Sequence, residues 1–298
     1  MFTLRQLKYF VAVAKHGNIT TAAESLHVSQ PGVSTAIAQL EAMFDVQLFV
    51  RQRARGVILT PAGRALMASA LELLNHVSDV MTLGSSLDDS VKGPLRIGFY
   101  HTIGPYLLPG LLRHFHDLYP LVDISLTEGN LAELHLALNS SDIELAILYD
   151  LDLPEQFAHV HLMGLPPYVL VAANSDLASR QEISIHELTQ EPMVLLDLPH
   201  SSEYFRMLFL TLNVKPRISY RTRSVSMVRS LVANGFGYSI LNFQATVRTD
   251  NDGMPLAYLR IKENFPRLDV LLAWPRGVHL TRRARNFIEI AQAYTRKP

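Results

Sequence analysis

The chain contains no cysteine among its 298 residues, and this absence excludes two classes of protein. Without thiols there is neither a disulfide framework nor a cysteine-ligated zinc site. Charged residues make up only 18%, and the formal net charge is zero, so the whole chain shows no polyanion-binding signal. A hydrophobic content of 48% excludes a disordered chain, and the length suits two domains or one large one.

Long apolar runs are also missing, which excludes a membrane-spanning helix. The N-terminal stretch MFTLRQLKYFVAVAKHG is apolar enough to suggest a signal peptide. However, Arg5, Lys8 and Lys15 interrupt it, and the run YFVAVA is too short for the hydrophobic region of such a peptide. We therefore expect a cytoplasmic protein with no membrane partner.

The few charges are unevenly distributed. Residues 1–65 carry seven basic and three acidic side chains, a net charge of +4, and the remainder carries −4. A basic N-terminal module on an acidic body indicates that only the first part of the chain meets a polyanion.

The first sixty residues predict three helices and a short strand pair. The first helix covers residues 4–16, and the second opens at TTAAESL, with Thr21 and Glu24 at capping-box spacing. Ser29 is a natural N-cap for the third helix, with Pro31 acceptable in its first turn. Two β-prone pieces, LFVR and VIL, flank the arginine-rich turn QRARG.

The third helix has two contrasting faces. Val33, Ile37 and Leu40 form an apolar stripe at helical spacing. The opposite face carries short, uncharged side chains: Ser34, Thr35, Ala38 and Gln39. A buried helix pair with a solvated outer face would explain this pattern, but so would a helix-turn-helix whose second helix enters the DNA major groove.

Several residues of this region have the chemistry of DNA readout. Gln30 can pair bidentately with adenine, and Ser34 and Thr35 can hydrogen-bond to several bases. The helix N-terminus favours a phosphate. A wing at the arginine turn would reach the DNA backbone or minor groove through Arg51, Arg53 and Arg55.

A long helix is expected from Pro61 to about Asp88. Its heptad-like seam consists of Leu66, Ala70, Leu73, Val77 and Val80. The seam fits either an amphipathic helix packed on its own domain or a dimer-forming helix. GSSLDDSVKGP, residues 84–94, is typical of a linker.

Beyond residue 94, strands alternate with helices, which predicts parallel α/β sheets with crossover helices. The expected strands are 95–99, 122–129, 144–149, 168–173, 193–198, 217–222, 237–241 and 268–274. The expected helices are 107–119, 130–139, 204–212, 225–234 and 280–294.

The N-terminal stretch resembles the DNA-binding domain of LysR-type transcriptional regulators. The matching pieces are L-x-x-F-x-x-V at the start, AAE-x-L, VSQP-x-VS, QLE, LF and LTPAG, a dense match over about sixty residues. The remainder, from GPLRIGF to GFGYSIL, resembles more loosely the periplasmic-binding-protein-like effector domain of that family.

The resemblance implies a winged helix-turn-helix domain (1–62), a dimerising linker helix and hinge (63–90), and a two-lobed α/β effector domain (91–298). Lobe I would comprise about 91–163 and 268–298, and lobe II about 164–267. The implied partners are double-stranded operator DNA, a small-molecule effector, RNA polymerase, and further copies in a homodimer or homotetramer.

The base-contacting face implied by the resemblance consists of Gln30, Pro31, Ser34 and Thr35, and the arginine turn matches the wing. Thr35 departs from the family pattern, because many members carry arginine there. A short hydroxyl thus replaces a guanine-reading fork, and the operator sequence cannot be carried over.

Ligands of parallel α/β domains bind beyond the carboxyl ends of strands, where helices begin. The polar residues at such junctions are His101, Thr102, Asn130, His200, Ser201, Tyr204, Thr222, Ser224 and Ser226. Helix N-termini favour a small carboxylate, whereas Phe99, Tyr100 and Tyr204 would suit an aromatic effector. Plain helix caps are the alternative for each Ser and Thr. The resemblance favours the junctions FYHT and LPHSS.

Two other functions fit parts of the chain. An α/β enzyme with an accessory helical domain is disfavoured because no G-x-S-x-G, H-E-x-x-H, P-loop or complete G-x-G-x-x-G is present. A solute-binding protein is disfavoured by the basic N-terminal module. The pair His114 and His116 falls on different faces of a helix, so we expect no metal and no cofactor.

Overall fold

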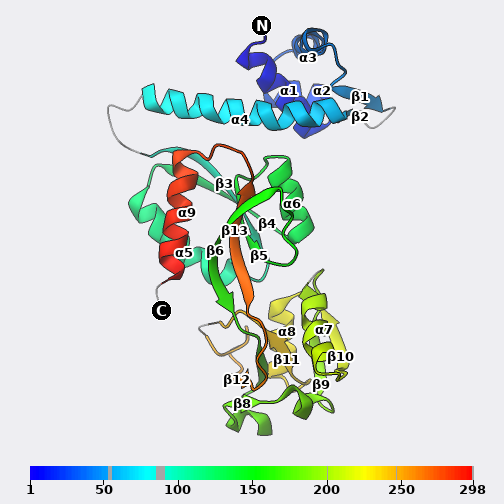
Figure 1. Ribbon diagram of the computed structural model, residues 1–298, viewed down its shortest axis with the longest axis vertical. Helices are drawn as coiled ribbons and strands as arrows, with labels where there is room; N and C mark the ends of the chain where they lie inside the picture. The colour runs from blue at the N-terminus through cyan, green and yellow to red at the C-terminus, as the bar shows by residue number, and fades with distance from the viewer. Residues whose placement is uncertain (53–55, 85–90, 200, 246, 297–298) are drawn as a thin grey trace.

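The computed structural model describes every residue except 53–55, 85–90, 200, 246 and 297–298 (Figure 1). A helical module at the N-terminus is followed by a long helix, α4. Both lie across one end of an α/β body that is built from two lobes. Among the described helices, none is both long and apolar enough to cross a bilayer.

The N-terminal module is a three-helix unit with a small hairpin. Its elements are α1 (Leu4–His16), α2 (Ile19–Ser25), α3 (Gln30–Phe44), β1 (Phe49–Gln52) and β2 (Gly56–Leu59). Leu7 and Phe10 of α1 meet Leu40 of α3 in a core that the first half of α4 completes. The module therefore has a hydrophobic core of its own.

Two helix boundaries expected from the sequence are confirmed. Helix α1 ends at Gly17, whose φ of 62° lies in the left-handed region that glycine adopts without strain. Ser29 caps α3, and its side chain accepts a hydrogen bond from the Gly32 amide at 3.4 Å. Pro31 lies in the first turn of α3, where its missing N–H has no helical partner to lose.

The expected start of the second helix is wrong. Helix α2 begins at Ile19, and Asn18 is its N-cap. The Asn18 side chain accepts from the amides of Thr20 and Thr21 at 2.7 and 3.2 Å. These backbone N–H groups at the helix start have no helical partner, so Asn18 caps the helix and no Thr21–Glu24 capping box is needed. Asparagine is at least as good an N-cap as threonine, so the helix can start earlier in the chain.

Helix α4 (Pro61–Gly84) changes environment along its length. Met67, Ala70 and Leu71 are buried in the module core. Further along, Leu73 and Val80 are 37% and 64% exposed. The expected helix end at Asp88 and most of the expected linker lie outside the described residues.

Lobe I is built on a five-stranded sheet with strand order β4-β3-β5-β13-β6. The strands are β3 (Gly93–Tyr100), β4 (Val122–Gly129), β5 (Leu145–Tyr149), β6 (Phe157–Leu165) and β13 (Leu268–Pro275). The helices are α5 (Gly104–Leu118), α6 (Leu131–Asn139) and α9 (Arg282–Thr295). Strand β3 is parallel to β4 and β5, whereas β13 is antiparallel to β5 and β6.

Lobe II contains a four-stranded sheet of order β11-β7-β12-β8 and the parallel pair β10-β9. The strands are β7 (Tyr168–Ala172), β8 (Glu182–Ile183), β9 (Pro192–Leu196), β10 (Arg217–Thr222), β11 (Ser239–Leu241) and β12 (Leu256–Ile261). The helices are η1 (Asp176–Ser179), η2 (Ile185–Leu188), α7 (Ser201–Thr211) and α8 (Val225–Ala233). The Val194 amide donates to the Tyr238 carbonyl at 2.8 Å, which links the two sheets.

The expectation of parallel sheets holds only in part: β3 is parallel to β4 and β5, and β9 to β10, but both lobes also contain antiparallel pairs. The chain passes from β6 into β7 and returns from β12 into β13, so β13 re-enters lobe I antiparallel to its neighbours. Strands β6 and β12 were not expected from the sequence. Strand β6 forms an edge of its sheet, and Phe157 and Leu162 are its only fully buried residues, which weakens its apolar signal.

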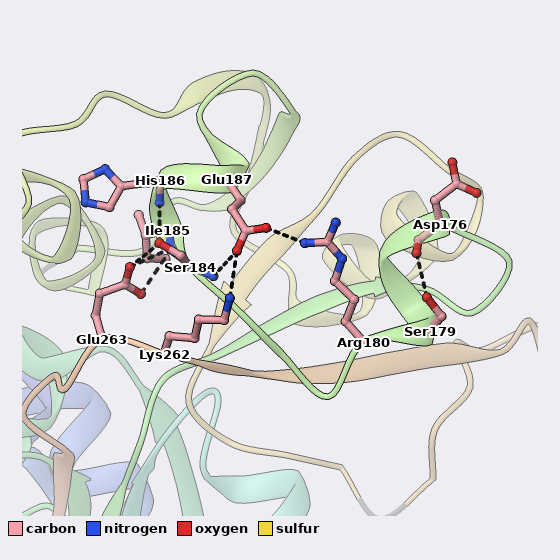
Figure 2. Close-up of polar contacts among 9 residues, drawn as sticks. All are labelled: Asp176, Ser179, Arg180, Ser184, Ile185, His186, Glu187, Lys262 and Glu263. Atoms are coloured by element: carbon pink, nitrogen blue, oxygen red, sulfur yellow. Dashed lines mark hydrogen bonds and ion pairs between the residues drawn. The ribbon is translucent and has the colours of Figure 1, made fainter.

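One polar network fastens η2 to the chain that follows β12 (Figure 2). The Glu187 carboxylate accepts from the Ser184 amide at 3.0 Å, from the Arg180 guanidinium, and from Lys262 Nζ at 3.2 Å. The Ser184 hydroxyl donates to Glu263. The Ser184 amide first, and then Arg180 and Lys262, lower the pKa of Glu187 from 4.5 to about 2.

This network predicts a loss of stability in acid. Because the folded pKa of Glu187 lies below its ordinary value, its stabilisation is complete above pH 4.5 and is lost as the pH falls to about 2. Glu187→Gln should lower the urea midpoint at neutral pH and flatten the pH dependence over that interval. Urea denaturation followed by circular dichroism from about pH 7 to about pH 2 measures this.

The matched control is Glu155→Gln, an exposed lobe I carboxylate with no ion pair among the described residues. It should keep the wild-type pH profile. Identical profiles for Glu187→Gln and wild type would show that the network does not stabilise the fold.

Candidate nucleic-acid interface and interlobe cavity

Helix α3 packs against the core of the N-terminal module on one side only. Val33, Ile37 and Leu40 are buried in the core of the N-terminal module. The residues on the other side are exposed, except for the half-buried Ser34: Gln30, Pro31, Thr35, Ala38 and Gln39. The helix therefore presents a shallow, uncharged face to its surroundings.

The two ends of this face differ. Gln39 accepts a hydrogen bond from the Gln6 amide group of α1 at 2.8 Å, which ties the far end of the face to α1. The first turn of α3 holds no acidic side chain, so the positive end of the helix dipole is not neutralised by its own residues. The first half of α3 is thus the part suited to base edges and a phosphate.

The hairpin β1–β2 packs against α1 and α4, and a close backbone contact positions it. The Val57 amide donates to the Gly17 carbonyl at 2.8 Å. Gly56 has φ +85°, and a Cβ there would lie 2.1 Å from the Gly17 carbonyl oxygen. Arg51 belongs to β1, although its side chain is not described. Arg53 and Arg55 lie outside the described residues.

This contact predicts a large effect of one methyl group. Gly56→Ala should destabilise the N-terminal module by more than about 1 kcal/mol, because alanine is strained at this φ and its Cβ would overlap Gly17. Thermal denaturation followed by circular dichroism measures the loss. Gly253→Ala is a suitable control for strain alone, since its φ is also positive but nothing lies within 4 Å. Equal losses in both variants would mean that the contact with Gly17 adds nothing.

A cavity of about 20 Å³ lies between the two lobes. This is room for about one water molecule. Its lining comes from both lobes and consists of Thr102, Tyr106, Tyr149, Phe205, Val225, Leu241, Asn242, Phe243 and Leu268. The rings of Tyr106 and Phe243 stack at 5.0 Å across the lobes. The lobes are therefore closed on each other in this arrangement.

The cavity wall carries a few polar groups with specific partners. Thr102 Oγ1 and the Tyr149 hydroxyl share a hydrogen bond of 2.9 Å. Asn242 Nδ2 donates to the Leu165 carbonyl at 3.1 Å and to the Tyr204 hydroxyl at 3.0 Å. Asn242 Oδ1 is buried and has no hydrogen-bond partner among the described residues. A buried acceptor without a donor is costly, so this atom is a candidate contact for a ligand.

The described part of the wall is uncharged. Burial raises the pKa of Tyr149 and of Tyr106 above the ordinary value for a phenol, so both hydroxyls stay neutral. Arg229 lies behind the wall, only 6% exposed. Its guanidinium donates to the Tyr258 hydroxyl at 2.9 Å and to two backbone carbonyls. These neutral acceptors hold the cation in the interior of lobe II.

Two of the residues expected at an effector site lie at this cavity. Thr102 lines it and is 8% exposed. Tyr204 contacts it indirectly, through its hydrogen bond with Asn242. The structure therefore brings together one residue from the FYHT junction and one from the helix that follows LPHSS.

The other expected residues have local partners or lie elsewhere. His101 Nδ1 is 2.9 Å from Glu128, and Asn130 caps α6 by accepting from the Glu133 amide at 3.1 Å. The Ser224 amide donates to Thr222, and Ser226 is exposed. His200 lies outside the described residues, and the side chain of Ser201 is not described.

Sequence reasoning missed Tyr149 and Asn242. Tyr149 is the last residue of β5, and Asn242 directly follows β11, so both lie at the carboxyl end of a strand. The rule that ligands bind at these ends would have found them. Neither residue directly precedes a helix, so the pattern of polar groups at helix starts does not include them.

Comparison with known proteins establishes the class to which this architecture belongs. Residues 4–64 match the family of bacterial regulatory helix-turn-helix proteins of the lysR type, and residues 88–296 match the LysR substrate binding domain. The chain is a DNA-binding transcriptional regulator with an effector-binding domain, and this class is not enzymatic. It belongs to the LysR family.

Relatives extend over nearly the whole chain. The HTH-type transcriptional regulator YvbU of Bacillus subtilis is 31% identical, covering 97% of this chain and 98% of its own. The DNA-binding transcriptional dual regulator OxyR of Escherichia coli is 30% identical, covering 97% and 95%. A LysR family regulator from Pseudomonas aeruginosa, the PA01 protein, covers 100% of both chains with 34% identity and a TM-score of 0.67. A cysteine variant of full-length OxyR from the same species reaches a TM-score of 0.76 at 25% identity, covering 100% of this chain and 98% of its own.

Proposed function

We propose that this protein binds a specific operator through the N-terminal half of α3 and the wing β1–β2, and that a small molecule bound between the lobes controls it. The observation that supports the proposal most is that α3 is buried on one face and exposed on the other. Val33, Ile37 and Leu40 hold the helix from behind, while short polar side chains remain exposed in front. A face of this kind fits the major groove, and its hydroxyl and amide groups read base edges.

The effector is proposed to bind reversibly. Several relatives are named hydrogen peroxide-inducible genes activators. This chain cannot sense peroxide through a thiol, because it has no cysteine. Control by a bound small molecule needs only that one arrangement of the lobes binds it better than another.

The lining supports an aromatic or otherwise uncharged effector more than a small carboxylate. Aromatic rings, aliphatic side chains and neutral hydroxyl and amide groups form the described wall. A carboxylate there would lose its hydration without meeting a free cation. Since the present cavity holds about one water, the lobes must open to admit a larger molecule.

Oligomeric assembly is part of the proposal. Leu73 and Val80 leave an apolar stripe exposed on α4. On lobe I, Leu118, Leu121 and Leu126 are exposed on α5, the loop after it and β4. Apolar surface of this kind suits burial in a homodimer or homotetramer. We further propose that the regulator acts in the cytoplasm, on operator DNA, together with RNA polymerase.

The division of roles within the DNA interface is testable by substitution. Ser34→Ala should change the preferred sequence while leaving the salt dependence of binding unchanged, because Ser34 is proposed to touch bases. Arg53→Ala should weaken binding on every sequence and reduce the slope of log K against log salt by about 0.9, as expected for one lost phosphate contact. Selection from random DNA, followed by titration at several salt concentrations, measures both effects.

Two results would contradict this interface. One is equal impairment of both variants on every sequence, which would remove the distinction between base and phosphate contacts. The other is the absence of any preferred site for the wild-type protein at every salt concentration.

The interlobe site is testable at Thr102. Thr102→Ala removes the partner of the Tyr149 hydroxyl and should weaken the response to an effector while basal DNA binding stays intact. The effector is first found by a thermal-shift screen of small metabolites on the full chain, because a bound ligand raises the melting temperature. Ser226→Ala, an exposed position on α8, is the matched control. A variant that fails to fold would assign Thr102 a structural role instead.

A further inference from the structure

Among the described residues, two side-chain contacts join the DNA-binding domain and α4 to lobe I. Lys15 Nζ, in the last turn of α1, lies 3.0 Å from Asp142 Oδ1. The ring of His76 on α4 meets the ring of His279 edge-on, with centroids 5.3 Å apart. Figure 1 shows the DNA-binding domain and α4 lying across the end of lobe I that is opposite lobe II. The two contacts come from separate elements on each side, so together they fix an orientation.

Asp142 is held in place before it meets Lys15. The chain turns sharply after α6, with Ser141 at φ 55° and the Asp142 amide donating to the Ala137 carbonyl at 2.9 Å. The Ser140 hydroxyl donates to Asp142 Oδ2 at 2.6 Å, which leaves Oδ1 for Lys15. A pre-positioned carboxylate loses less side-chain entropy on pairing than a free one.

The two lobe I segments that make these contacts lie side by side. Ser141 and Ile143 line the same small cavity as His279 and Leu280. The Thr281 hydroxyl also donates to Glu144 at 3.4 Å. Asp142 and His279 therefore belong to one continuous patch of lobe I.

Each segment continues into a strand that reaches the interlobe cavity. Strand β5 begins three residues after Asp142 and ends at Tyr149, which lines the cavity. Strand β13 begins at Leu268, also in the lining, and ends four residues before His279. The two strands are hydrogen-bonded neighbours, so they can move as one rigid unit. A displacement at the cavity can then reach the patch at their other ends.

The charge of Asp142 bears directly on DNA binding. Lys15 is one of the seven basic side chains of residues 1–65. Paired with Asp142, it contributes less to the attraction between this domain and DNA phosphates. Exposed ion pairs are weak, so a modest rearrangement of lobe I is enough to break the contact.

We propose that Asp142 and His279 form a docking surface on lobe I for the chain's own DNA-binding domain, and that the docked arrangement binds DNA less tightly than the released one. The link to the cavity rests on the proposed function, in which an effector binds between the lobes. Docking itself is a property of the free protein and is measurable without any effector.

The test is a double-mutant cycle on the full-length protein. The probe is a DNA duplex selected from random sequence by the wild type, titrated by fluorescence anisotropy. Asp142→Asn keeps the shape of the side chain and should tighten binding about two- to fivefold, as expected for release of an exposed ion pair. In a Lys15→Gln background the same substitution should have no effect, because the pair is already broken. His279→Ala removes the second contact and should also tighten binding.

The matched control is Glu155→Gln, which removes one negative charge from lobe I at a site without an ion pair among the described residues. It should bind DNA as the wild type does. Docking is overturned if Asp142→Asn binds with wild-type affinity, if its tightening persists in Lys15→Gln, or if Glu155→Gln tightens equally. The preference of the wild type for the selected duplex over a scrambled one reports separately on the proposed function.

Discussion

The attachment of α3 by its apolar stripe is the constraint on which the rest of the molecule depends. Val33 and Leu40 are fully buried, so the helix cannot turn about its axis without exposing them. This fixed rotation keeps Gln30 and Thr35 pointing outward, and it requires no charged residue on the exposed face. In the proposed interface, other basic groups of the domain attract the phosphates, so the exposed face of α3 can carry short side chains that read bases.

In the effector domain, the corresponding constraint is that the chain crosses between the lobes twice. Strands β6 and β13 are antiparallel neighbours in lobe I; the chain enters lobe II after β6 and returns to lobe I at β13. Two such connections act as a hinge, and the cavity lies where the lobes meet beyond the ends of β5 and β11. The lack of cysteine in the chain and of charge in the described wall is the basis for proposing reversible binding of an uncharged molecule at this site.

The interface between DNA-binding domain and lobe I connects these two constraints. The patch around Asp142 and His279 lies at the far ends of the strands whose near ends line the cavity. A weak polar contact is suited to such a place, since a strong apolar one would lock the domain in a single arrangement. The family relationship is evident over the whole chain, whereas this contact is a feature of particular side chains.

Local chemistry in the sequence determined the caps at Gly17 and Ser29, the two faces of α3, the α/β character of the effector domain and the family itself. The caps, the faces of α3 and the α/β character follow from the spacing of neighbouring residues, whereas the family follows from the resemblance of the motifs. Local chemistry also set the start of α2, through the Asn18 cap. It did not determine the antiparallel pairing of β6 and β13, or the meeting of Thr102 and Tyr149 with Asn242. Those depend on partners far apart in the chain, such as Tyr149 in β5 and Asn242 after β11. Only packing of the two lobes brings such residues together, because no local pattern encodes a contact across that distance.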